Sequence, residues 1–354
     1  MNDLDSRLIY QEHDPSRMRE RLGSLPQQCL KGWEAGKALR VPPSYRDVDK
    51  VVFLGMGGSA IPGDLLAGLV GQESRLPFHV QRDYLPPGFT DARTLTMACS
   101  YSGETEETIE AFQESFRRKA KLIAITTGGA LGRLAQESRI PTLLLEPQGE
   151  PRSAVGTILF ALMGILQGLR IISPKDGDVA EAIGGLEVGV GRLGIEVPAS
   201  QNPAKKLALG LAGKMPIVYA AEALSGVARR WKTQFNENSK AWAFFDVLPE
   251  LDHNSVVGYP GPSAAKERLK VLFLSSFHYH ARTTLRIKIT EDLLSQEGIA
   301  WEEVAGRGQS PLSQMMSLIS LGDFASYYLA VLNGVDPSPV KVIDQLKSRL
   351  AEGG

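Results

Sequence analysis

The fold is decided by the stretch Lys50-Val-Val-Phe-Leu-Gly-Met-Gly-Gly-Ser-Ala-Ile-Pro-Gly-Asp64. Its first five residues are mostly β-branched or aromatic, which is typical of a short strand, and a helical pattern follows the glycine-rich segment. Glycines let the backbone approach a ligand closely, and the first turn of a helix presents free N–H groups and a positive partial charge. We expect Pro62 in that first turn, where its missing N–H costs nothing. The stretch therefore predicts a strand, a turn and a helix that binds an anion, with phosphate as the best candidate.

The rest of the first half repeats this alternation of strands and helices. Further strands are predicted at 78–81, 94–99, 121–126 and 141–145, followed by a closing helix at 152–169. Short strands separated by helices favour a parallel, doubly wound sheet. In the second half we expect strands at 216–219, 255–259, 271–274 and 300–304, and helices at 222–243, 282–296, 312–332 and 340–350. A glycine-rich segment around 184–203 predicts a boundary between two α/β domains, residues 1–185 and 200–354.

Composition narrows the class of protein. The chain has 354 residues, of which 43% are apolar and 22% charged, and this excludes a mainly disordered or fibrous protein. Lys and Arg number 39 against 40 Asp and Glu, so no basic excess indicates nucleic acid or an anionic membrane as a partner. Two cysteines cannot form a disulfide framework, no signal peptide is visible, and the uncharged stretch 153–169 is expected to be a buried helix. We expect a cytoplasmic soluble protein whose anionic ligands are held by local donors.

A second turn follows the third predicted strand and has the sequence Ser100-Tyr-Ser-Gly-Glu-Thr-Glu-Glu-Thr108. It offers hydroxyls at Ser100, Ser102 and Thr105, together with backbone donors around Gly103. Parallel sheets bind ligands beyond the carboxyl ends of their strands, where both turns lie. Two turns that converge on one phosphate monoester would explain these hydroxyls. The alternative is an ordinary helix N-cap at Ser102 or Thr105.

A dinucleotide site is the main competing interpretation of the first turn. Gly55, Gly57 and Ala60 match the pattern G-x-G-x-x-A, and Asp83 follows the second strand, where a ribose-binding acid would be expected. Such a site has no need of the second turn. A tight turn without any ligand is the remaining alternative.

The two turns, GMGGSAIPGD (55–64) and SYSGETEET (100–108), resemble the sugar isomerase (SIS) domain, a phosphosugar-binding module. The resemblance implies a five-stranded parallel sheet in a three-layer αβα sandwich. It also implies that several residues hold the sugar phosphate, namely Gly58, Ser59, Ser100, Ser102 and Thr105. Pro62 and Glu104 replace the commoner glycine and asparagine of that pattern, and neither supplies a phosphate donor in it.

Two polar runs in the second half suggest acid–base chemistry. FNENSK (235–240) contains Glu237 and ELDHN (250–254) contains His253, and Glu and His suit proton transfer at neutral pH. Each alone could be a surface residue. In this order the runs resemble the bifunctional phosphoglucose/phosphomannose isomerases, over nearly the whole chain. The resemblance implies that Glu237 moves the proton through a cis-enediol. It further implies that His253 opens the sugar ring from the neighbouring subunit of a homodimer.

Three further residues follow from the same resemblance. Arg152, in EPRSAVG (150–156), would stabilise the charge on the enediolate oxygens. Lys347 of the last helix would reach the sugar, with Lys341 as the alternative. Ser338 takes the place of the usual threonine, and its small hydroxyl would leave room for either C2 epimer. We expect Arg229 and Arg230 on a solvated helix face, with a role at the active site as the alternative.

The implied protein has two SIS-type domains and needs no metal or other cofactor. It would interconvert glucose 6-phosphate or mannose 6-phosphate with fructose 6-phosphate. A phosphosugar sensor without chemistry is the second hypothesis, which the Glu237–His253 pair disfavours because a sensor has no need of it. A dinucleotide-dependent oxidoreductase is the third.

Overall fold

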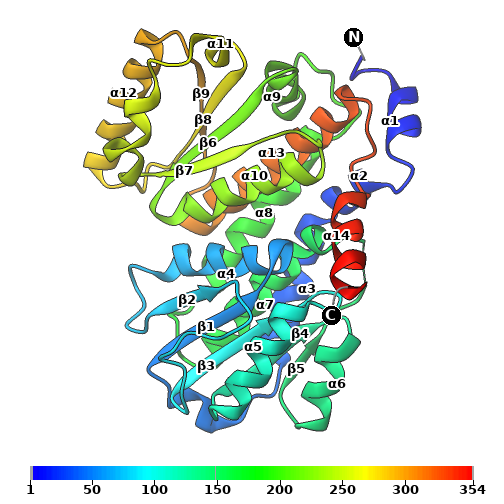
Figure 1. Cartoon of the computed structure of the whole chain (residues 1–354), viewed down its shortest axis with the longest axis vertical. Helices are drawn as coiled ribbons and strands as arrows, with labels where there is room; N and C mark the ends of the chain where they lie inside the picture. The colour runs from blue at the N-terminus through cyan, green and yellow to red at the C-terminus, as the bar shows by residue number, and fades with distance from the viewer. Residues whose placement is uncertain (1–2, 148, 353–354) are drawn as a thin grey trace.

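The alternation predicted for the first half is present in the computed structural model, which describes residues 3–147 and 149–352. Five parallel strands form one sheet in the order β2-β1-β3-β4-β5 (Figure 1). All five lie where the sequence predicted them. Their bounds are β1 (Lys50–Gly55), β2 (Phe78–Gln81), β3 (Thr94–Cys99), β4 (Lys121–Thr126) and β5 (Thr142–Leu144).

Alternate residues of β1 explain the three layers of this half. Val51 and Phe53 belong to one hydrophobic core, whereas Val52 and Leu54 belong to another on the opposite face of the sheet. Helices cover both faces, so the predicted αβα sandwich is confirmed. On the first face lie α3 (Leu25–Ala38), α4 (Gly57–Val70) and α7 (Val155–Gly168), and on the second α5 (Glu106–Arg117) and α6 (Gly129–Glu137).

The second half forms its own parallel sheet, with four strands in the order β7-β6-β8-β9. Figure 1 shows α12 on one side of this sheet and α10 and α13 on the side that faces the first half. The expected second α/β sandwich is therefore present. Its elements are β6 (Met215–Ala221), α10 (Ser225–Glu237), β7 (Phe244–Leu248), α11 (Ser263–Lys266), β8 (Leu269–Ser275), α12 (Ala281–Gln296), β9 (Ala300–Ala305) and α13 (Pro311–Leu332).

One predicted strand of the second half is wrong. Residues 255–259 form a 3-10 turn, η5 (Ser255–Gly258), and the edge strand is instead β7, which pairs with β6. The turn is closed by polar side chains, because Asn254 accepts a hydrogen bond from the backbone N–H of Ser255 and the Ser255 hydroxyl donates to Asp246. The β-branched Val256 and Val257 therefore lie in a local hydrogen-bonded turn rather than in a strand.

The glycine-rich segment between the halves is more ordered than predicted. Helix α8 (Asp176–Leu193) continues through it, and α9 (Pro203–Leu211) starts after an N-cap at Asn202, whose Oδ1 accepts from the N–H groups of Ala204 and Lys205. The predicted boundary between residues 185 and 200 spans the end of α8 and the loop after it. It stays a prediction.

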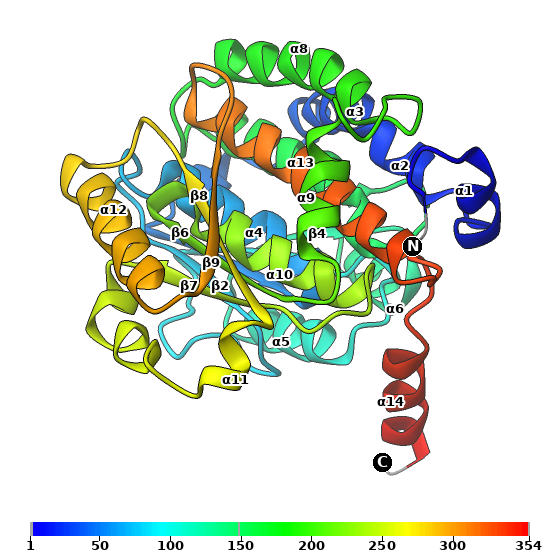
Figure 2. The same cartoon turned by 90° about the horizontal axis from the view of Figure 1, so that it is seen from above.

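Apolar helices form the centre of the molecule. The predicted buried helix at 153–169 is confirmed as α7, preceded by the short turn η2 (Pro151–Ala154). Helix α13, with 22 residues, is long and apolar enough to cross a membrane, but 83% of its most apolar window is buried inside the fold. It is the core helix of a soluble protein. The terminal helices are α1 (Arg7–His13), α2 (Met18–Gly23) and α14 (Lys341–Glu352), the last of which projects from the body (Figure 2).

Close packing of α4 against α10 joins the halves and positions the site (Figure 1). A Cβ atom at Gly68 would lie 2.9 Å from the Ala223 carbonyl oxygen, and one at Gly226 would lie 3.1 Å from the backbone of Asp64 and Leu65. Glycine therefore permits this approach. Gly68, near the end of α4, meets Ala223 just before α10, whereas Asp64, earlier in α4, meets Gly226 further along the chain. The two helices are therefore antiparallel. The N-terminus of α4 consequently faces the C-terminus of α10.

Candidate active site

The first glycine-rich turn forms an uncapped helix N-terminus. Helix α4 begins at Gly57, and in the described structure the side chain of its N-cap residue, Met56, makes no capping hydrogen bond. The Ser59 hydroxyl accepts from the backbone N–H of Tyr101 at 3.2 Å, which ties the first turn to the second. Pro62 was predicted in the first helical turn but is the sixth residue of α4, where it leaves the Gly58 carbonyl without the usual helical donor.

The second turn also leaves its helix without a side-chain cap. Thr105 is the N-cap residue of α5, but among the described contacts its hydroxyl accepts from Ser100 Oγ at 2.8 Å instead of capping the helix. Ser102 is exposed, and its hydroxyl accepts from the Glu104 N–H. Gly103 has φ +73°, and a Cβ there would lie 1.9 Å from the Gly128 carbonyl oxygen. Two uncapped helix ends joined through Ser59 make an electropositive cradle of the kind that binds phosphate.

Asp83, the acid of the dinucleotide alternative, has a local role in the structure. It is exposed, and its carboxylate accepts from the N–H of Tyr84 at 2.7 Å. That contact closes its own turn beyond β2.

Arg152 connects the first turn with the second half. Its backbone lies against Gly58, where a Cβ would be 2.8 Å from the Arg152 nitrogen. Only 3% of the residue is exposed. The guanidinium donates to Asn238 Oδ1 at 2.7 Å and to the carbonyl oxygens of Pro337 and Ser338, both at 2.8 Å. Burial lowers the pKa of Arg152 from its ordinary value, although neighbouring carboxylates oppose this shift.

Glu237 ends α10 and lies next to Arg152. Its Oε2 accepts from Arg152 Nη1 at 3.3 Å, and 23% of the side chain is exposed. The antiparallel packing of α4 and α10 accounts for this position. The predicted carboxylate and the predicted phosphate turn are thus separated by a single arginine residue that contacts both.

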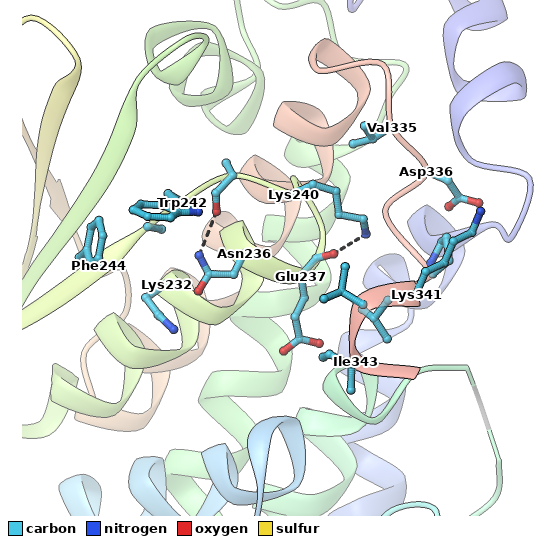
Figure 3. A pocket seen from close by; sticks show the side chains of 15 residues that line it. Lys232, Asn236, Glu237, Lys240, Trp242, Phe244, Val335, Asp336, Lys341 and Ile343 are labelled. Atoms are coloured by element: carbon cyan, nitrogen blue, oxygen red, sulfur yellow. Dashed lines mark hydrogen bonds between the residues drawn. The ribbon is translucent and has the colours of Figure 1, made fainter. Parts of the chain in front are cut away.

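The carboxylate of Glu237 and the side chain of Lys240 border a cavity of about 840 Å³ between α10, β7 and the C-terminal segment (Figure 3). Figure 3 shows the Glu237 side chain extending away from α10, and Lys341 at the start of α14 on the far side. Lys341 lines this cavity, whereas Lys347 lies exposed further along α14.

Lys240 is a site residue that the sequence analysis missed. Its ammonium group donates to the backbone carbonyl of Glu237 and to that of Pro337 at 3.1 Å, and its φ is +53°. Burial, followed by the charge of Arg152, lowers the pKa of Lys240 to about 8. The sequence offered one indication that Lys240 belongs to the site, its position three residues after Glu237 in FNENSK.

The expectation that Arg230 lies on a solvated helix face is wrong. Arg230 is buried and makes a bidentate ion pair with Asp323 of α13, with distances of 3.0 and 2.6 Å, and it also donates to the Arg152 carbonyl at 3.0 Å. Asn238 adds a second support for Arg152 by donating to Ser326 Oγ at 2.9 Å. Arg152 is therefore held from its backbone and from its guanidinium.

His253 is not brought to this place within one chain. It is exposed at the end of η4 (Glu250–His253), which follows β7, and among the described residues of a single chain it does not line the cavity beside Glu237. Its assignment to a neighbouring subunit stays a prediction.

Ser338 lies beside Arg152 and is 7% exposed. Its carbonyl binds Arg152, and its hydroxyl accepts from Arg21 at 2.9 Å. The structure thus brings three of the predicted residues, Gly58, Glu237 and Ser338, into contact with Arg152. It places Ser59, Ser100 and Thr105 in the adjoining turns.

Family models match both halves of the chain. The model of the SIS domain matches residues 44–163, and the model described as "Bacterial phospho-glucose isomerase C-terminal SIS domain" matches residues 200–350. Among solved structures, a hypothetical protein, TT0462, from Thermus thermophilus has a TM-score of 0.74 at 16% identity and covers 98% of this chain and 94% of its own. Tagatose-6-phosphate ketose/aldose isomerase from Escherichia coli has a TM-score of 0.71 at 17% identity, with 91% and 95% covered. At such identities these structures establish the fold.

Curated relatives are more similar in sequence. The bifunctional phosphoglucose/phosphomannose isomerase of Caldicellulosiruptor bescii is 40% identical over 336 residues, which is 95% of this chain and 99% of the relative. The protein of the same name from Aquifex aeolicus is 34% identical, with 85% and 90% covered. By these similarities and by the two SIS domains, the chain belongs to the bifunctional phosphoglucose/phosphomannose isomerase family.

Proposed function

We propose that this chain interconverts glucose 6-phosphate and mannose 6-phosphate with fructose 6-phosphate by metal-independent proton transfer. The proposal fits a family of isomerases, which are intramolecular oxidoreductases. The observation that carries it is the contact of Glu237 with Arg152 at 3.3 Å, because the Arg152 backbone lies against the Gly58 turn. A sugar phosphate held by the turns would extend its carbonyl end towards that carboxylate.

In the proposed mechanism the phosphate binds Gly58, Ser59, Ser100, Ser102 and Thr105. The Glu237 carboxylate takes the proton from C2 of the open-chain aldose, the electrons of that C–H bond form the C1–C2 double bond, and the carbonyl electrons move to O1 to give a cis-enediolate. The same group returns the proton to C1, while the proton of the C2 hydroxyl passes to O1, and the C2 carbonyl of the ketose results. The Arg152 guanidinium stabilises the negative charge that develops on the enediol oxygens.

One of the remaining roles needs a second copy of the chain. His253 would open the sugar ring after it enters from a second copy, so the proposal includes a homodimer working in the cytoplasm. Lys347 is the proposed C-terminal lysine at the sugar. Lys341 is its alternative, and this residue lines the Glu237 cavity. Ser338 would face C2 and accept either epimer.

A coupled assay tests the proposal. Purified protein is incubated with glucose 6-phosphate or mannose 6-phosphate, and fructose 6-phosphate is measured with and without EDTA. We expect turnover of both sugars that EDTA leaves unchanged. Tight sugar-phosphate binding without turnover would instead favour the sensor hypothesis. Binding of NADH without sugar-phosphate binding would favour the oxidoreductase.

A further inference from the structure

The Ser338 side chain is held in place by Arg21, a residue of the N-terminal helices. Its hydroxyl accepts a hydrogen bond from Nη2 of Arg21, in α2, at 2.9 Å. Its backbone is fixed as well, because its carbonyl accepts from Arg152 and its N–H donates to Asp336 Oδ1 at 2.9 Å. The residue therefore has little freedom in either its backbone or its χ1 angle.

Arg21 is itself held by a salt bridge. The Nη2 that contacts Ser338 also donates to Glu150 Oε1 at 2.9 Å, and Glu150 Oε2 accepts from the Ser153 hydroxyl at 3.1 Å. Burial alone would raise the pKa of Glu150, but the Ser338 hydroxyl and the charges of Arg21 and Arg152 outweigh it and lower that pKa. Glu150 is consequently an ionised partner, and its pair with Arg21 is a charged one.

The backbone next to this pair is built around the Arg21 side chain. Gly149 has φ +79°, and a Cβ there would lie 2.6 Å from both Cδ and Nε of Arg21. Glycine is thus required at this position on two grounds, its left-handed conformation and the close approach of the arginine. The pair joins α2, the loop before η2 and the C-terminal segment, which are distant in sequence.

We propose that Arg21 and Glu150 are positioning residues that set the preference between glucose and mannose phosphates by fixing the Ser338 side chain. The inference rests on the proposed function, in which Ser338 faces C2 of the sugar. With the pair intact, the hydroxyl is directed towards Arg21 and the small remainder of the side chain is left towards the substrate. Without the pair, χ1 is free and the hydroxyl can rotate into the space that the two epimers fill differently.

The test compares kcat/KM for the two sugar phosphates in Arg21→Met and Glu150→Gln. Loss of one charged hydrogen bond should change the mannose-to-glucose ratio of kcat/KM by about three- to tenfold in Arg21→Met, and by less in the isosteric Glu150→Gln. Ser338→Ala should change the ratio as well. When Arg21→Met is combined with Ser338→Ala, the mannose-to-glucose ratio should equal that of Ser338→Ala alone, because the hydroxyl that Arg21 positions is absent.

Arg19→Met is the matched control. Arg19 also lies in α2 and forms a salt bridge, with Asp14, and its side chain is 28% exposed against 18% for Arg21. The Arg19→Met variant should have a lower melting temperature than the wild type but the same mannose-to-glucose ratio of kcat/KM. An unchanged ratio in both Arg21→Met and Glu150→Gln would overturn the inference, and so would an equal change in Arg19→Met. Wild-type protein that converts neither sugar would instead refute the proposed function, and the inference with it.

Discussion

The two halves of the site are built differently. The two turns proposed to bind phosphate consist of consecutive residues, 55–64 and 100–108, and backbone groups and small hydroxyls form them. The other half gathers Arg152, Glu237, Lys240 and the 337–338 backbone from three distant segments through long side chains. A local turn keeps its geometry from its own sequence, whereas the gathered half depends on the packing of α4 against α10. Substitutions in the turns should therefore weaken binding, and those in the gathered half should affect chemistry and stability together.

The largest effect is expected for Glu237→Gln. The amide keeps the size of the side chain but cannot take a proton, so kcat should fall by about a thousandfold. Binding of a phosphorylated sugar acid, measured by calorimetry, should stay within about threefold of the wild type because the turns are intact. Glu187→Gln, at an exposed carboxylate on α8, is the control. Wild-type turnover in Glu237→Gln would remove this residue from the mechanism.

Arg152→Met should damage both chemistry and stability. The variant removes the cation beside Glu237 and leaves Asn238 Oδ1 and two backbone carbonyls without this donor. We expect kcat to fall by about a hundredfold and the free energy of unfolding in urea to drop by about 2–4 kcal/mol. Arg152→Lys keeps the charge but not the planar guanidinium group, so its kcat and its stability should lie between those of the wild type and those of Arg152→Met. Normal stability and normal kcat in Arg152→Met would contradict the proposed difference between the two halves of the site.

Ser100→Ala should act mainly on substrate affinity. The change removes the hydroxyl that bonds Thr105 at 2.8 Å and one proposed phosphate ligand. KM should rise about tenfold, with kcat reduced less than about threefold. Thermal stability should fall modestly, because Ser100 Oγ also accepts from the backbone N–H of Thr105 at 3.3 Å. A large loss of kcat with an unchanged KM would mean that the turn contributes to chemistry instead.

The smallest effect concerns the pH dependence of stability at Lys240. Its pKa is lowered to about 8 in the folded chain, so between pH 8 and its ordinary value of 10.5 the unfolded chain binds more protons. The charged ammonium therefore destabilises the fold below about pH 8, and this penalty disappears as the pH rises towards 10.5. Urea midpoints of the wild type should rise relative to Lys240→Met between pH 8 and 10.

Arg152→Met sharpens this prediction, because the charge of Arg152 helps to lower the pKa of Lys240. In that background the pH trend should shrink. A constant difference between wild type and Lys240→Met across the range would show that Lys240 titrates as an ordinary surface lysine. Asp336, Glu237 and Glu150 also act on Lys240 and oppose the shift.

Sequence patterns predicted the first sheet well because β1 and β4 are largely apolar runs and short turns or helices separate the strands. They failed at β7, where Phe244–Leu248 contains Asp246 and the more β-branched run at 255–259 is held in a turn by Asn254 and Asp246. At residues 255–259, side-chain hydrogen bonds therefore determine the conformation more strongly than local β-propensity does.

Spacing in the sequence predicted the site only where its residues are close together, and the distant members Arg152, Glu237 and Ser338 were predicted from the family resemblance. The ion pair of Arg230 with Asp323 spans 93 positions, and its acid lies inside the apolar helix α13, so no spacing rule connects the two. The contact of Arg21 with Ser338 spans 317 positions. Such pairs are set by helix packing, which the one-dimensional pattern does not contain.

The most direct measurement is a crystal structure of the protein with a phosphorylated sugar acid, an analogue of the enediolate. Our account predicts the phosphate between the N-termini of α4 and α5, with the carboxylate of the ligand within hydrogen-bond distance of Arg152 and its C2 hydroxyl within hydrogen-bond distance of Glu237. A ligand whose phosphate lies elsewhere, or whose sugar end points away from Glu237 in every copy of the chain, would contradict it.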